Sequence, residues 1–133
     1  MSALAAAERP ALVVHAPDSP VRLERAVVLT PAEGPPVLLY SATNLTDEDL
    51  EQFTVMAFVF DAEGTLKARQ VAPARHLLEA GTSRHSVLVL DGFPMDPTYV
   101  IVAGVNQAQR VGSSVGWRAD LQPAAEAAVQ PQP

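Results

Sequence analysis

Hydrophobic residues along the chain come in short runs that are separated by turn residues. The runs cover residues 11–15, 21–30, 37–43, 53–60, 65–71, 83–90, 98–103 and 115–119. Clusters of Pro, Gly, Asn and Asp stand between them, and these residues favour turns. Seven or eight strands spaced by roughly 10–15 residues predict an all-β fold, an immunoglobulin-like antiparallel β-sandwich.

Three of these runs also predict how their strands are covered. Residues 53–60 are apolar at nearly every position, which predicts a central strand covered on both faces. Residues 65–71 and 83–90 alternate between apolar and polar, which is typical of half-exposed strands. The segment 61–64 ends in Gly64 and predicts a hairpin turn, because glycine adopts positive φ without strain.

The same pattern divides the chain into three parts. We expect residues 1–10 to form a flexible N-terminal segment and residues 11–120 to form the sandwich. Residues 121–133 are rich in Pro, Ala and Gln and predict a disordered or weakly helical tail. Residues 44–52 fit either a single helical turn that Thr46 would cap or a plain acidic loop.

Composition narrows the function classes. The 12 prolines among 133 residues are about twice the usual ~5% and suit many short segments. The absence of Cys excludes disulfides, thiolate metal sites and cysteine nucleophiles. A net charge of −6 argues against nucleic-acid binding, which needs clustered Lys and Arg. We expect no cofactor, and no apolar stretch approaches the ~18 residues of a membrane-spanning helix.

The N-terminal residues 1–7 have the apolar character of a leader but lack its basic start, so we expect no intact signal peptide there. If a leader has been removed upstream, the protein is expected to be periplasmic or secreted. Otherwise it is expected to be cytoplasmic.

Three features between residues 38 and 90 resemble a known family. They are an Asn-containing turn at 43–47, a strand ending Phe58-x-Phe60-Asp61 before Gly64, and a Leu78-x-x-Gly81 turn. With these features the segment resembles bacterial immunoglobulin-like β-sandwich domains of the FxLYD or DUF4352 kind. The resemblance implies a sandwich fold that is often found in envelope-associated or secreted proteins, and it implies no catalytic residue.

Candidate chemistry is sparse. The segment 112–116 matches the G-x-S-x-G pattern of hydrolases, but no His follows it, so we predict that the protein is not an enzyme. The leading hypothesis is a protein-interaction or accessory structural module that binds another protein, or itself, through an edge strand. Four residues are its candidate contacts: Lys67, Arg69, Trp117 and Arg118.

The alternative hypothesis is a small-ligand or metal-binding domain. A metal ion would be held by His76, Glu79 and His85, because the two histidines flank a turn and Glu79 supplies a third ligand. The acidic residues 47–51 also offer oxygen ligands but lack the spacing of a calcium loop.

Overall fold

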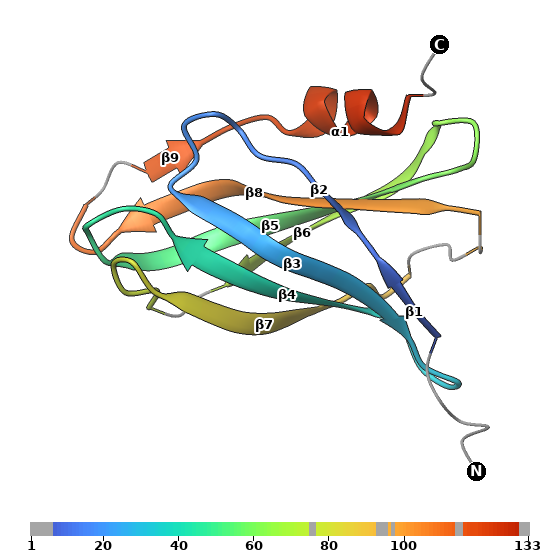
Figure 1. The fold of residues 1–133 in the computed structure, drawn as a ribbon, viewed down its shortest axis with the longest axis horizontal. Helices are drawn as coiled ribbons and strands as arrows, with labels where there is room; N and C mark the ends of the chain where they lie inside the picture. Colours follow the sequence, from blue (N-terminus) through green and yellow to red (C-terminus); the bar gives the residue numbers. More distant parts are fainter. Residues whose placement is uncertain (1–6, 75–76, 93–95, 97, 114–115, 131–133) are drawn as a thin grey trace.

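The computed structural model describes residues 7–74, 77–92, 96, 98–113 and 116–130. Within them the chain forms nine strands and one C-terminal helix (Figure 1), and the predicted all-β sandwich is confirmed. The elements are β1 (Ala7–Pro10), β2 (Leu12–Val13), β3 (Val21–Thr30), β4 (Val37–Asn44), β5 (Leu50–Phe60), β6 (Leu66–Ala74), β7 (Ser83–Val89), β8 (Val100–Arg110), β9 (Gly116–Arg118) and α1 (Gln122–Val129).

The strands form two sheets that pack face to face. Sheet A has the order β1-β3-β4-β7, and sheet B has the order β2-β8-β5-β6 with β9 also paired to β8. Strands β3–β9 thus build a sandwich of three strands against four, and β1 and β2 add to it from the N-terminal side. One short pair, β2 with β8, is parallel, whereas the other pairs are antiparallel.

Strand β5 explains the unbroken apolar run. It lies between β6 and β8, and every residue from Phe53 to Phe60 is buried. Phe53 faces the core between the sheets and packs edge to face against Tyr40, with the two ring centroids 6.5 Å apart. Phe58 and Phe60 point the other way, into a second apolar cluster with Leu121 of the segment leading into α1. The prediction of a strand covered on both faces is confirmed.

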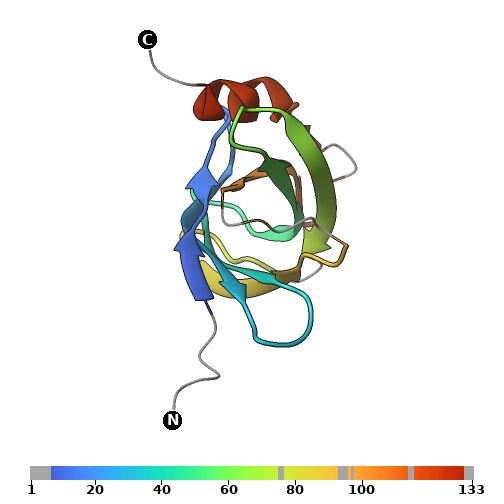
Figure 2. The ribbon, with the colours of Figure 1, turned by 90° about the vertical axis from the view of Figure 1, so that its right-hand side faces the viewer.

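The C-terminal helix provides that second cover. Leu121 and Ala125 are fully buried against sheet B, and α1 lies on the side of that sheet away from sheet A (Figure 2). Gly104 of β8 makes this possible, because a Cβ there would lie 2.7 Å from the carbonyl oxygen of Val14 and 2.8 Å from Cδ1 of Leu121. Helix α1 is therefore the short helical form of the tail expected from residue 121, and it packs against sheet B.

The boundary expected at residue 11 also falls inside the fold, because β1 begins at Ala7 and pairs with β3 along its whole length. Between β4 and β5 the chain forms the acidic loop rather than a helical turn. Asn44 organises this loop: its Nδ2 donates to the carbonyl oxygens of Glu48 and Leu78, and its Oδ1 accepts from the backbone and hydroxyl of Thr46.

The hairpin predicted after Phe60 is confirmed. Asp61 Oδ1 accepts hydrogen bonds from the backbone N–H groups of Glu63 and Thr65, and Gly64 has a φ of +85°. The carboxylate thus closes the turn that joins β5 to β6.

Candidate functional site

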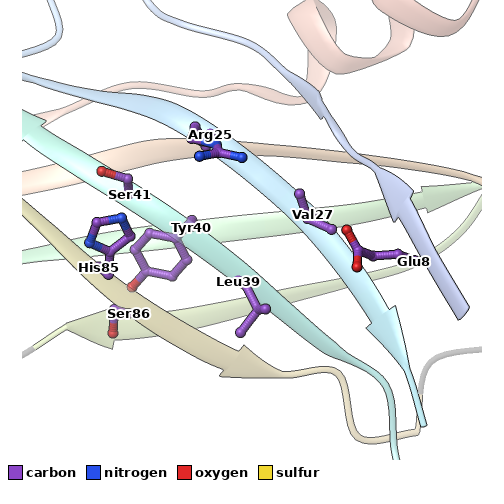
Figure 3. A pocket seen from close by; sticks show the side chains of 8 residues that line it. All are labelled: Glu8, Arg25, Val27, Leu39, Tyr40, Ser41, His85 and Ser86. Atoms are coloured by element: carbon purple, nitrogen blue, oxygen red, sulfur yellow. The ribbon is translucent and has the colours of Figure 1, made fainter. Parts of the chain in front are cut away.

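The outer face of sheet A carries a shallow hollow of about 380 Å³ (Figure 3). It crosses all four strands of the sheet, and its floor is the backbone and side chains of β4. It is lined by Glu8, Arg25, Val27, Leu39, Tyr40, Ser41, His85 and Ser86.

Strand register arranges the outward side chains of this face in three cross-strand rows. The basic row is Arg25–Ser41–His85, the central apolar row is Val27–Leu39–Val87, and the outer apolar row is Leu29–Val37–Val89. On β1, Pro10 pairs with Val27, and Glu8 pairs with Leu29. The face is therefore basic at one end, apolar in the middle, and acidic at the far end of β1.

Three apolar side chains on this face are exposed. Leu39, Val87 and Val89 keep 41%, 52% and 45% of their surface exposed, and they lie on adjacent strands. Sheet B presents the contrast, since helix α1 covers the apolar cluster on its outer face. Contiguous exposed apolar side chains bordered by charges are typical of a surface that another molecule covers.

The charges that border the hollow have no partners among the described residues. Arg25 and Glu8 form no ion pair or side-chain hydrogen bond with any described residue, whereas Arg22 lies 4.0 Å from Glu24.

Arg22 and Glu24 also shift the pKa of His15 in opposite directions. Burial, and then the positive charge of Arg22, lower the pKa of His15, and Glu24 opposes that shift.

The side chain of Tyr40 turns inward beneath this face. Burial raises the pKa of Tyr40, and a hydrogen bond with the Ser86 hydroxyl opposes the shift only in part. Its phenol therefore stays protonated at neutral pH, packed against Phe53 as a member of the core. A phenol held in this way supports the sheet.

Beside the hollow, β7 is an edge strand of sheet A. The N–H of Asn44 donates to Thr82 and the N–H of Leu90 donates to Pro36, so the even-numbered residues of β7 bond to β4. The backbone groups of residues 83, 85, 87 and 89 consequently point away from the sheet. One of them is already occupied, because Nε2 of Gln70 on β6 donates to the carbonyl oxygen of Val89 at 2.7 Å.

The four predicted contact residues do not form one site. Lys67 and Arg69 lie on β6, and Trp117 and Arg118 lie on β9, with β5 and β8 between these strands in sheet B. Arg69 donates to the side chain of Gln122 at 2.7 Å and so ties β6 to α1. Trp117 is half-buried against the core, while Lys67 and Arg118 are exposed.

The residues of the metal hypothesis are partly placed. Glu79 lies in the turn before β7 and His85 lies on the outer face of sheet A, while His76 is outside the described residues. Within the described ranges no three His, Asp or Glu side chains gather closely enough to hold a metal ion. Ser114 of the G-x-S-x-G segment also lies outside the described residues.

The acidic loop uses two of its carboxylates within the fold. Glu48 forms an ion pair with Arg110 at 2.8 Å, and Asp49 accepts a hydrogen bond from the backbone of Ala80. Among the described residues, no helix is long and apolar enough to cross a membrane.

Sequence reasoning missed the hollow for a definable reason. The alternation in β4 and β7 signals exposed valine and leucine, but the rows appear only when the register of β3, β4 and β7 is known.

No protein-family model, curated protein or solved structure matches the chain. The candidate site therefore depends on its own geometry.

Proposed function

We propose that this domain is a non-enzymatic protein-interaction module that binds its partner on the outer face of sheet A, beside the edge of β7. The observation that carries the proposal is the exposed apolar surface made by Leu39, Val87 and Val89 around the hollow. Its counterpart on sheet B is covered by the domain's own helix.

The energetics favour a protein partner over isolated charge contacts. Covering three side chains that are now about half exposed contributes roughly 1 kcal/mol each at 25 cal/mol per Å². Exposed ion pairs contribute less, about 0–1 kcal/mol each. The apolar rows would therefore supply most of the affinity, and Arg25 and Glu8 would fix the orientation.

The edge of β7 supports the same function. Its outward backbone groups at residues 83, 85 and 87 offer a place where an extended segment can add to the sheet. Residues 67 and 69 carry Lys and Arg on the outer face of β6, which opposes strand addition at the edge of sheet B.

The resemblance to bacterial immunoglobulin-like domains adds a context. We propose that the module serves a larger envelope-associated assembly, as a periplasmic or secreted accessory domain. The supporting features are those of the segment 38–90, including the turn at Asn44 and the hairpin at Asp61 and Gly64.

A matched pair of exposed valines tests the proposal. Val87 on β7 and Val71 on β6 are both 52% exposed and lie on the edge strands of opposite sheets. We would place a photo-crosslinking amino acid at each position in the full chain and irradiate the cells that produce it. The proposal expects a defined protein adduct from position 87 and none from position 71. Equal adducts at both positions, or none at 87, would refute it.

A further inference from the structure

We propose that the occupant of the outer face of sheet A is a second copy of this chain, docked face to face about a two-fold axis. The inference depends on the proposed function, because it names the partner of the same surface. The axis lies in the plane of the face and runs across the strands along the central apolar row, Val27–Leu39–Val87.

The order of the rows makes this face complementary to itself. A two-fold rotation about the central row leaves that row facing its own copy. It also brings the basic row of one copy over the outer apolar row of the other, beside Glu8 of β1. Aligned packing of two sheets at about −30° accommodates such an arrangement.

The charges distinguish this arrangement from intramolecular pairing. Glu8 lies beside Leu29, four residues along β3 from Arg25, or about 13 Å at 3.3 Å per residue. The two side chains form no ion pair with each other within one copy, and no described residue satisfies either charge. Across the two-fold axis, Arg25 of each copy comes next to Glu8 of the other, which gives two reciprocal pairs.

The shape of the surface is also complementary to itself about this axis. Ser41 is a small residue between the long side chains of Arg25 and His85, so the basic row is a depression. The two-fold rotation places Val37 of the other copy, from the middle of its outer apolar row, over Ser41. Val37 and Ser41 both lie on β4, so the dimer contains this contact twice, once from each copy.

The size of the face places the dimer among weak, reversible associations. Four strands about 4.8 Å apart and about seven residues long give a flat footprint of roughly 400 Å² on each copy. The total of roughly 800 Å² is below the ~1,200 Å² of standard stable interfaces. We therefore expect a reversible dimer with a dissociation constant of about 10–100 µM.

Sedimentation equilibrium of the full chain over a concentration series tests the dimer, with charge reversals at its two ends. Glu8→Arg and Arg25→Glu each turn two attractive pairs into two repulsive ones, and each is expected to raise the dissociation constant about tenfold. An equimolar mixture of these two variants restores both pairs, so it is expected to regain wild-type association as a heterodimer. Glu63→Arg, an exposed acid in the β5–β6 turn, is the matched control and is expected to leave association unchanged.

Each outcome decides between the claims. A wild-type monomer throughout the series would overturn the dimer. If the mixture of variants stayed as weak as each variant alone, the two-fold arrangement would be wrong. If crosslinking from position 87 gave an adduct with a different protein, the proposed function would stand and the second copy would be excluded. If position 87 gave no adduct, both claims would fail.

Discussion

Gly104→Ala tests how the domain covers the outer face of sheet B. In β8, Gly104 lies under both the segment after β2 and the segment before α1. An added Cβ would meet the carbonyl oxygen of Val14 at 2.7 Å and Cδ1 of Leu121 at 2.8 Å. The Val14 carbonyl cannot move freely, because the N–H of the same residue donates to Ala103 at 3.0 Å.

Two effects of this substitution oppose each other. Replacing Gly by Ala reduces the entropy of the unfolded chain, which stabilises by about 0.4–1 kcal/mol where the backbone permits it. Overpacking against a fixed backbone atom costs about 1–3 kcal/mol, and any lifting of Leu121 adds part of the ~1.5–3 kcal/mol of its burial. The steric cost is larger, so we expect a net loss of about 1–2 kcal/mol in the free energy of unfolding.

Urea unfolding followed by circular dichroism measures this loss as a lower midpoint with an unchanged slope. Leu121→Ala and the double variant complete the test. Removing the Leu121 side chain relieves one of the two close contacts, so the double variant should lose about 1 kcal/mol less than the sum of the single losses. A Gly104→Ala protein as stable as the wild type would refute the packing of these segments over β8.

Three further predictions concern other contacts. Asn44→Ala removes four hydrogen bonds of a buried side chain, two to the carbonyl oxygens of Glu48 and Leu78 and two from Thr46, so we expect a loss of about 2–3 kcal/mol in urea unfolding; a loss under about 0.5 kcal/mol would contradict this network. The pKa of His15 is lowered in the folded state, so the unfolded chain binds a proton first and the free energy of unfolding falls as pH drops below 6.5. An NMR titration should find the lowered pKa of His15, and Arg22→Gln should raise that pKa. Trp117→Phe removes a buried indole N–H that has no partner among the described residues, so we expect a change within about 1 kcal/mol, and a loss above 2 kcal/mol would reveal a partner for that N–H.

The fold could be predicted because local patterns and turns agree with each other. The alternation in residues 83–90 and the continuous run 53–60 specify burial directly, and Gly64 marks its turn. The docking of α1 was harder to predict, because its alanines carry little hydrophobicity. Its position depends on the absence of a side chain at Gly104, a distant residue that carries no helical signal.

The candidate site could not be predicted for a related reason. Exposed residues such as Leu39 and Val87 are recognisable in their own strands, but they become one surface only through the pairing of β4 with β7. Sequence reasoning selected Arg69 and Trp117 by residue type. The structure places Arg69 against the helix and Trp117 against the core. Residue type suggests what a side chain can bind, while register decides which side chains meet.

The most direct test of the central claim is an amide NMR dilution series of the wild-type chain from about 1 mM to about 10 µM, a range that spans the expected dissociation constant. The account predicts that concentration-dependent shifts gather in Val27, Leu39, Ser41 and Val87 and leave Val71 of sheet B unmoved. Shifts confined to β6 and α1, or a spectrum that is independent of concentration, would contradict it.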